Sequence, residues 1–172
     1  LNEAGDSDVG RHQILPLLMG NLKPDIDPGY YERGLDIAET LELNWDQGEA
    51  MASSYATELA YLVQGPPGTG KTRVLATLAR ALVSDGERVL ICSFTHRAIN
   101  NALNALYKQD PQIDAIKVGH PIQAKDLLVK NYETFHVSPL AGKRGGYVVG
   151  ATPFATRTQR LSSVTFDTVI FD

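Results

Sequence analysis

The sequence has little of what stabilises small secreted proteins or anchors proteins in a bilayer. Cys92 is the single cysteine, which excludes an intramolecular disulfide framework and a four-cysteine zinc site. No apolar run approaches the roughly 20 residues that cross a bilayer, so we expect no membrane span. The chain begins at Leu1 without the charged and apolar regions of a signal peptide, and we therefore expect a cytoplasmic location.

Length and composition indicate a globular chain. The 172 residues fit one domain with a short appendage, since a domain usually holds about 100–200 residues. Hydrophobic residues make up 43% of the chain, which is enough for a core and argues against disorder.

The charge is unevenly distributed, although the net charge of -4 argues against a generally basic coat for nucleic acid. Residues 1–60 hold 12 acidic and 3 basic residues, whereas residues 117–160 hold 2 acidic and 7 basic ones. Such asymmetry can mark a local anion-binding face. The alternative is an ordinary solvated surface of mixed sign.

The positions of proline and glycine and the spacing of apolar residues divide the chain into two parts. Residues 1–42 are acidic and broken by proline and glycine, which predicts a separate, partly helical segment with short helices near Gln13–Met19 and Tyr31–Leu41. Residues 43–172 alternate between apolar runs of strand length and stretches with helical spacing. We expect Asp46 to cap the first helix of this part, which ends near Thr57.

Further along, the same patterns predict helices over residues 71–84 and around 99–106. Strands are expected at Ala60–Val63, Arg88–Cys92, Ala115–Val118, Tyr147–Val149 and Thr168–Phe171, with a mostly irregular stretch between residues 122 and 146. Alternating strands and helices of this kind predict an α/β fold with a mostly parallel sheet covered on both faces. In such sheets, ligands bind at the carboxyl ends of the strands.

A glycine-rich loop is the most specific motif. Gly65, Pro66, Pro67, Gly68, Thr69, Gly70, Lys71 and Thr72 fit the phosphate-loop pattern G-x-x-x-x-G-K-[ST] between an expected strand and an expected helix. Glycines let backbone N–H groups converge on a polyphosphate, and the start of the helix adds the positive end of its dipole. We expect Lys71 to contact the β- and γ-phosphates and the Thr72 hydroxyl to bind Mg²⁺, with Arg73 among the nucleotide-binding residues.

A carboxylate at the end of an apolar strand complements this loop. Asp172 follows Thr168–Phe171, and phosphate-loop enzymes hold Mg²⁺ with the loop hydroxyl and an acid at a strand end. Lys71 and Asp172 are therefore the candidate catalytic residues, with Thr72 and Asp172 on the metal. The alternative for Asp172 is an aspartate that caps a turn.

Four further segments accompany these two motifs, and together they carry a family resemblance. The four are Leu43-Asn44-Trp45-Asp46-Gln47, Cys92 to Asn100 with the sequence CSFTHRAIN, Val118-Gly119-His120-Pro121 and Gly150-Ala151-Thr152-Pro153-Phe154, and the last motif of the series is Val169 to Asp172. In this order, they resemble the first RecA-like motor domain of superfamily 1 helicases, of the up-frameshift-like branch (superfamily 1B). The resemblance covers about residues 43–172.

The resemblance implies a three-layer RecA-like P-loop fold that uses ATP and Mg²⁺ to move along single-stranded DNA or RNA. A second RecA-like domain would complete the ATP site in the full-length chain. Gln47 would read the adenine edge, where the alternative is an exposed helix glutamine. Thr95, Arg97 and Asn100 would contact the phosphates of the strand, and Thr152 would lie in the next loop that faces nucleic acid. The basic stretch 117–160, interleaved with aromatic residues, is typical of a groove for single strands.

The sequence also departs from this family pattern. The carboxylate expected after Asp172, the glutamine that senses the γ-phosphate and the arginine fingers do not occur in it. We therefore expect a piece of a longer helicase that binds nucleotide weakly and hydrolyses it negligibly. A different P-loop enzyme, such as an AAA+ type ATPase or a small-molecule kinase, and a non-catalytic nucleotide-binding interaction module are the alternatives.

Overall fold

The computed structural model describes residues 11–12, 15–21 and 24–172, and these form two compact units. The first unit extends to Gly65 and the second runs from Pro66 to Asp172. The boundary between these compact units falls inside the glycine-rich loop. Part of the helix expected near Gln13–Met19 lies outside the described residues, which show α2 at Leu15–Leu18.

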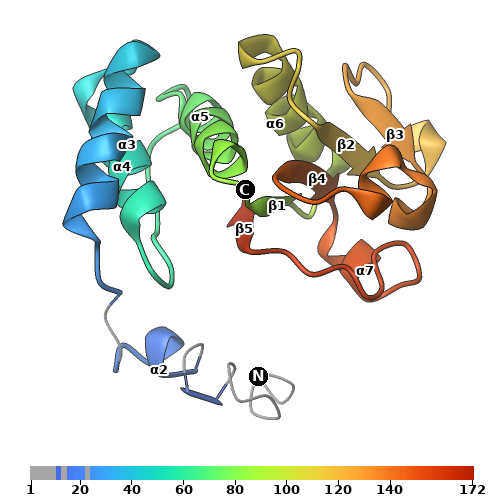
Figure 1. Cartoon of the computed structure of the whole chain (residues 1–172), viewed down its shortest axis with the longest axis horizontal. Helices are drawn as coiled ribbons and strands as arrows, with labels where there is room; N and C mark the ends of the chain where they lie inside the picture. Colours follow the sequence, from blue (N-terminus) through green and yellow to red (C-terminus); the bar gives the residue numbers. More distant parts are fainter. Residues whose placement is uncertain (1–10, 13–14, 22–23) are drawn as a thin grey trace. The chain divides into compact units, whose positions relative to one another are not determined.

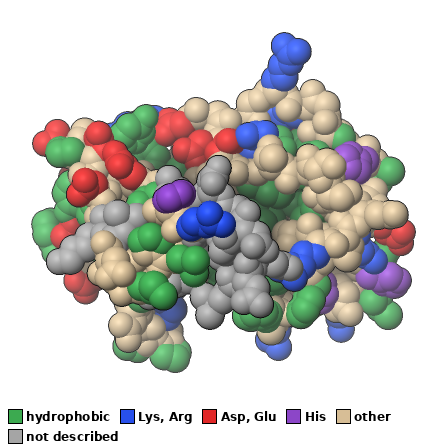
Figure 2. Space-filling model, turned by 90° about the horizontal axis from the view of Figure 1, so that it is seen from below, with side chains coloured by type: hydrophobic (Ala, Val, Ile, Leu, Met, Phe, Trp, Pro, Cys, Tyr) green, Lys and Arg blue, Asp and Glu red, His purple; other side chains and the backbone are tan. Residues whose placement is uncertain are grey.

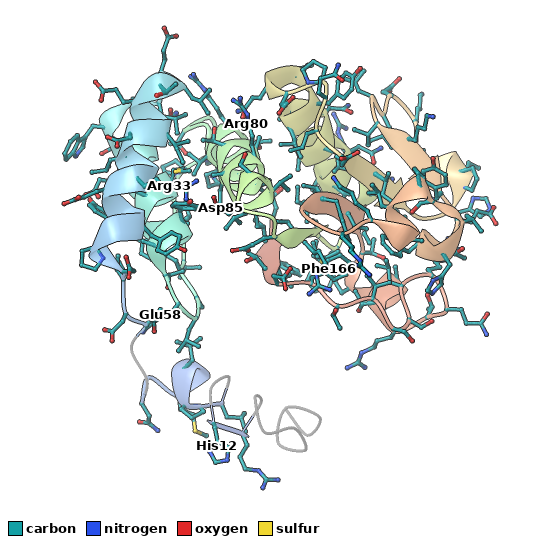
Figure 3. All side chains as sticks on the ribbon, in the orientation of Figure 1. His12, Arg33, Glu58, Arg80, Asp85 and Phe166 are labelled. Atoms are coloured by element: carbon teal, nitrogen blue, oxygen red, sulfur yellow. The ribbon has the colours of Figure 1, made fainter. Side chains whose placement is uncertain are left out.

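The first unit is built on the packing of α3 (Pro28–Thr40) against α4 (Trp45–Ala56). The two helices approach closely because Gly34 has no side chain. A Cβ atom at this position would lie 2.7 Å from the Cα atom of Ala52. Tyr55 packs on the same contact, and the guanidinium of Arg33 (labelled in Figure 3) lies 5.7 Å from the centre of its ring.

The cap of α4 differs from the sequence expectation. The N-cap is Asn44, whose Oδ1 accepts a hydrogen bond from the Gln47 N–H at 2.9 Å. The Gln47 side chain in turn accepts from the Asn44 N–H at 3.2 Å, which completes a capping box. Asp46 lies in the first turn instead, where its negative charge complements the helix dipole. The prediction that Asp46 is the cap was wrong, because asparagine at residue 44 offers an equally good acceptor two residues earlier.

The second unit contains a five-stranded sheet in which every pair is parallel (Figure 1). The spatial order is β3-β2-β4-β1-β5. The strands are β1 (Arg88–Cys92), β2 (Ala115–Val118), β3 (Lys130–Tyr132), β4 (Tyr147–Ala151) and β5 (Thr168–Phe171). Four of the five were predicted close to these bounds, and the parallel α/β class is confirmed.

The sheet is the middle of three layers. Two helices, α5 (Lys71–Ser84) and α6 (His96–Gln109), pack on one face. The other face is covered by two 3₁₀ turns, η3 (Phe135–Val137) and η4 (Pro139–Gly142), and by the short helix α7 (Pro153–Thr156). Phe166, which precedes β5 and is labelled in Figure 3, packs against the same apolar cluster.

Two local predictions did not hold. The segment Ala60–Val63 was expected to be a strand, but it has no regular structure and pairs with none of the five strands. A strand needs a neighbour, and that neighbour is a property of the tertiary fold rather than of the local pattern. Conversely, the 122–146 stretch contains β3, which is short, polar and at the edge of the sheet. No helix of the described residues is long and apolar enough to cross a membrane.

Candidate functional site

The glycine-rich loop forms a turn directly before α5. The Thr69 hydroxyl donates to the Pro66 carbonyl oxygen at 2.9 Å, and Gly68 and Gly70 have φ values of 85° and 84°. A side chain at either glycine would be strained in this left-handed conformation. Gly70 is the N-cap of α5 and supplies no side-chain cap, so the positive end of the helix dipole faces outward.

The side chains of the loop are open to a ligand. Pro66, Pro67, Gly68 and Thr69 are exposed, and Lys71 and Thr72 are partly exposed in the first turn of α5. The Lys71 ammonium donates a hydrogen bond to the Pro66 carbonyl oxygen at 2.9 Å. Of the remaining predicted nucleotide-binding residues, Arg73 is exposed on α5, whereas Gly65 and Gln47 belong to the first unit.

Asp172 lies at the carboxyl end of β5, next to the end of β1. Its backbone N–H donates to the Cys92 carbonyl oxygen at 2.9 Å, and its side chain is exposed. Phe94, just after β1, and Phe171 meet edge to face with ring centres 5.3 Å apart. Asp172 is therefore held beside the loop that follows β1.

The start of α5 lies at the same end of the sheet, the end at which the carboxyl termini of the parallel strands meet. Only three residues separate the end of α5 from β1, and α5 packs on β1, so the helix must run antiparallel to the strands. Its first turn, with Lys71 and Thr72, then faces the edge at which the parallel strands end. The Thr72 hydroxyl and the Asp172 carboxylate thus lie at the carboxyl end of the sheet, where α/β sheets bind ligands.

Three of the predicted nucleic-acid contacts occur at this edge as well. Thr95 caps α6, where its hydroxyl accepts from the Ala98 N–H at 3.2 Å, and Arg97 is exposed in the first turn. Thr152 is half-buried and directly follows β4. Because β4 lies beside β1, the loops that carry these residues are neighbours.

Asn100 is placed differently, in the interior. Its side chain is only 8% exposed, and all its polar groups are engaged within the chain. The amide nitrogen donates to the carbonyl oxygens of Gln123 and Lys125, each at 3.1 Å. The amide oxygen accepts from the ammonium of Lys117 at 2.6 Å. The structure thus gives Asn100 partners inside the protein.

Lys117 is a residue that the sequence reasoning missed. It lies on β2, is fully buried, and donates to Asn100 Oδ1 and to the Gln123 carbonyl oxygen. Burial lowers the pKa of the Lys117 ammonium from 10.5 to about 8. The signal in the sequence was a single lysine within an otherwise apolar strand.

A pocket of about 230 Å³ opens at the carboxyl ends of β2 and β4. Its polar lining consists of His96, His120, Gln123, Thr152, Thr158 and Arg160, and none of the lining residues is acidic. Phe154, which is 71% exposed, also lines it. The pocket therefore offers hydroxyl groups and the Arg160 guanidinium beside an exposed aromatic ring, a combination suited to a phosphate or a base.

His96 is the most unusual group in this lining. Its Nδ1 atom is buried and has no hydrogen-bond partner among the described residues. Burial lowers the pKa of the His96 imidazole, and the positive charges of Lys117 and Arg160 lower it further. A neutral imidazole has one nitrogen that donates and one that accepts a hydrogen bond. The sequence marked His96 only by its position beside Thr95.

The two units differ in surface charge. In Figure 2, acidic side chains gather on the side of the first unit, and those of Lys, Arg and His are spread mainly over the second. This agrees with the net charge of the segments in the sequence, in which residues 117–160 are the most basic.

Comparison with known proteins shows the family to which this chain belongs. The model of the AAA_11 family, described as an AAA domain, matches residues 42–140. The chain belongs to this family. The match covers α4, the glycine-rich loop, α5, α6 and the strands up to β3.

Several relatives carry names of helicases. The Saccharomyces cerevisiae protein "DNA replication ATP-dependent helicase/nuclease DNA2" is 33% identical over 118 residues, which are 67% of this chain and 8% of that protein. The Schizosaccharomyces pombe "DNA polymerase alpha-associated DNA helicase A" is 32% identical over 111 residues, 64% of this chain and 16% of that protein. The Mus musculus "DNA-binding protein SMUBP-2" is 28% identical over 113 residues, 63% of this chain and 10% of that protein.

These similarities confirm the resemblance to superfamily 1 helicases that the motif order indicated. The chain spans at most 16% of the length of these three relatives.

Proposed function

We propose that this chain is the ATP-binding part of an ATP-dependent helicase that translocates on single-stranded nucleic acid. The observation that carries the proposal is the shared edge of the sheet. The glycine-rich loop, the Asp172 carboxylate and the loops with Thr95 and Thr152 all lie there. Membership of the AAA domain family and the similarity to named helicases support it.

The phosphates of ATP would bind at the start of α5. Backbone N–H groups of the loop and the helix dipole favour an anion there, and Lys71 adds a positive charge. To reach the β- and γ-phosphates, the Lys71 ammonium would leave the Pro66 carbonyl oxygen. We further propose that Gln47 contacts the adenine, so that Gln47→Ala abolishes a preference for ATP over GTP.

Thr72 and Asp172 would hold Mg²⁺. A hydroxyl and a carboxylate supply the oxygen ligands that this ion prefers, and each is exposed or partly exposed at the ligand-binding edge. Held by these two side chains, Mg²⁺ would supply positive charge beside the phosphates of the nucleotide. This part of the chain positions the phosphates, and a second RecA-like domain of the full-length protein would complete the cleft.

The nucleic-acid strand would pass over the ends of β1 and β4. Arg97 can form charge-assisted hydrogen bonds to phosphate, and the hydroxyls of Thr95 and Thr152 can donate to the same backbone. Phe154 offers a surface on which a base can stack. The nucleic-acid strand and the nucleotide would then both bind at the carboxyl end of the same sheet. Binding of one could therefore change the binding of the other.

The nucleotide part is tested by titrating the full chain with ATP and Mg²⁺ and measuring heat or fluorescence. We expect binding in the wild type and a roughly tenfold to hundredfold loss in Lys71→Ala, the cost of hydrogen bonds to charged groups. Lys108→Ala, which removes an exposed lysine from the last turn of α6, is the matched control and should bind as the wild type. Equal binding by both variants would exclude the proposed phosphate site.

The nucleic-acid part needs its own pair of variants. Arg97→Gln should weaken the binding of a fluorescent single-stranded oligonucleotide and reduce the salt dependence of its affinity by about one counterion. Arg144→Gln removes the same charge from the turn before β4, at the opposite edge of the sheet, and should have no such effect. An equal loss in the two variants would show that only the net charge matters.

A further inference from the structure

The buried Lys117 ammonium has no acidic partner among the described residues. Its hydrogen bonds go to neutral oxygens, those of the Asn100 amide and the Gln123 carbonyl group, and burial is the cause of its lowered pKa. A buried charge without a counter-charge is costly, and an apolar side chain of similar volume usually stabilises a core at least as well. Stability of the core therefore does not explain why a lysine occupies this position.

The partners of Lys117 point to another explanation. Asn100 joins α6 to the segment 119–128, which we call the β2–β3 loop, by donating to the carbonyl oxygens of Gln123 and Lys125. One turn further along α6, Asn104 donates to the Asp126 carbonyl oxygen at 2.7 Å and accepts from the Leu128 N–H at 2.7 Å. The β2–β3 loop is thus fastened to α6 at two places.

The hydrogen bonds of Asn100, the first of these two connections, lie next to the pocket. The β2–β3 loop contributes His120 and Gln123 to the lining, and α6 contributes His96 from its first turn. The ring of His96 is close to the lysine, since a Cβ atom built on Gly119 would lie 3.8 Å from both His96 Cε1 and Lys117 Cε. Lys117 and Asn100 therefore connect α6 with the pocket-lining part of the β2–β3 loop, whereas Asn104 bonds to Asp126 and Leu128, which do not line the pocket.

We propose that Lys117 is a positioning residue that, with Asn100, holds the β2–β3 loop in the orientation in which its side chains form the nucleic-acid pocket. This inference rests on the proposed function, in which the nucleic-acid strand contacts Thr152 and Phe154, two residues that line the pocket. Lys117 itself contacts no ligand in this scheme. Its ammonium fixes the Gln123 carbonyl group, and through it the wall that contains His120 and Gln123.

The test uses Lys117→Met in the full chain, because methionine fills a buried site without an ammonium group. We expect the melting temperature to equal or exceed that of the wild type. Hydrogen exchange should become faster at the amides of Gln123 and Ala124, which bond within the loop, and remain slow in β1 and β4. The affinity for a single-stranded oligonucleotide should fall about tenfold, as for the loss of a hydrogen bond to a charged group.

Two further variants separate positioning from general stability. Asn104→Ser loosens the outer fastening and should change the affinity less than twofold. Asn100→Ser should lower the affinity as Lys117→Met does, and the double variant should be no weaker than either single one, because both residues act through one network. If Lys117→Met does not fold, Asn100→Ser with the same exchange and affinity measurements decides the question.

The outcomes are distinct. Wild-type affinity in a variant whose loop amides exchange faster would overturn the proposal, and so would a loss of affinity that follows melting temperature across all variants. If the wild-type chain binds no single strand, the proposed function fails. The exchange measurement would still report whether Lys117 orders the loop, so the two failures can be told apart.

Discussion

The Lys71 ammonium donates a hydrogen bond to the carbonyl oxygen of Pro66, five residues earlier in the same loop, at 2.9 Å. The side chain that we expect to bind phosphate is thus folded back on its own loop, in a partly exposed environment. A phosphate would offer it a charged acceptor in place of a neutral one.

This arrangement predicts that Lys71→Met lowers the melting temperature only when nucleotide is present. Without nucleotide, the melting temperature should change by no more than about 2 °C, because an exposed hydrogen bond contributes little. With excess ATP and Mg²⁺, the wild-type melting temperature should rise through ligand binding to the folded state, and that of the variant should stay low. Thermal melting with fluorescence detection measures both. A large loss of stability in the nucleotide-free variant would contradict the prediction.

Acid should weaken the contact between Arg88 and Asp167, at the amino end of the sheet. The Arg88 guanidinium donates to both carboxylate oxygens, at 2.9 and 2.7 Å, and these bonds lower the pKa of Asp167 from 3.8 to about 2. The unfolded chain therefore takes up this proton at a higher pH than the folded one. Stability from this pair is present above about pH 4 and is lost as the pH falls to about 2.

Asp167→Asn should remove this part of the acid dependence. Urea unfolding of the wild type and the variant between pH 2 and 6 tests the prediction. The difference between their free energies of unfolding should shrink as the pH falls. A difference that is constant with pH would mean that Asp167 acts through its hydrogen bonds without its charge.

Two glycines of the first unit should respond oppositely to alanine. At Gly34, a Cβ atom would lie 2.7 Å from the backbone of Ala52, so Gly34→Ala should destabilise by about 1–3 kcal/mol through overpacking. At Gly48, in α4, the nearest atom to an added Cβ is the Ala38 Cβ at 3.5 Å, which is ordinary contact. Gly48→Ala should stabilise by up to about 1 kcal/mol through helix propensity. Chemical denaturation decides, and a similar effect of both changes would refute the close approach of α3 and α4.

Alkaline pH should stabilise the protein through Lys117. Its pKa is about 8 in the folded chain and 10.5 as its ordinary value, so the unfolded chain holds the proton more tightly between these values. The free energy of unfolding should therefore rise from about pH 8 to 10.5 by this contribution. Burial raises the pKa of Cys92 and Tyr147, which act in the opposite sense, so the comparison must be made against Lys117→Met. The variant should lack the rise, and parallel pH profiles would show that Lys117 is not buried as a cation.

Much of the second unit could be predicted from local patterns. The helix over residues 71–84 and the strands Arg88–Cys92, Ala115–Val118 and Thr168–Phe171 have the predicted bounds. The spacing of apolar residues in these segments follows from their burial in the sheet or against it, and this spacing can be recognised within a short stretch of sequence. The glycine-rich loop was equally visible, since its chemistry depends on residues that are consecutive in the chain.

The rest depended on contacts between distant residues. The edge strand β3 is polar and has no apolar period, and the segment 60–63 resembles a strand without having a partner. The interior place of Asn100 follows from Lys117, 17 residues away, and from a loop that shows no regular pattern. The pocket combines residues from three separate stretches of the chain, and only the strand order brings them together.

Gly150 occupies the register position beside Lys117 in the β2–β4 pair. A Cβ atom at this glycine would lie 2.5 Å from Leu103 and 2.8 Å from Ile99, both on α6. The bare backbone of β4 therefore lets the helix settle against the sheet at the level where Asn100 meets the lysine. A bulkier residue at position 150 would therefore push α6 away from the sheet and move the Asn100 amide away from the Lys117 ammonium, which would leave a buried cation with one acceptor fewer.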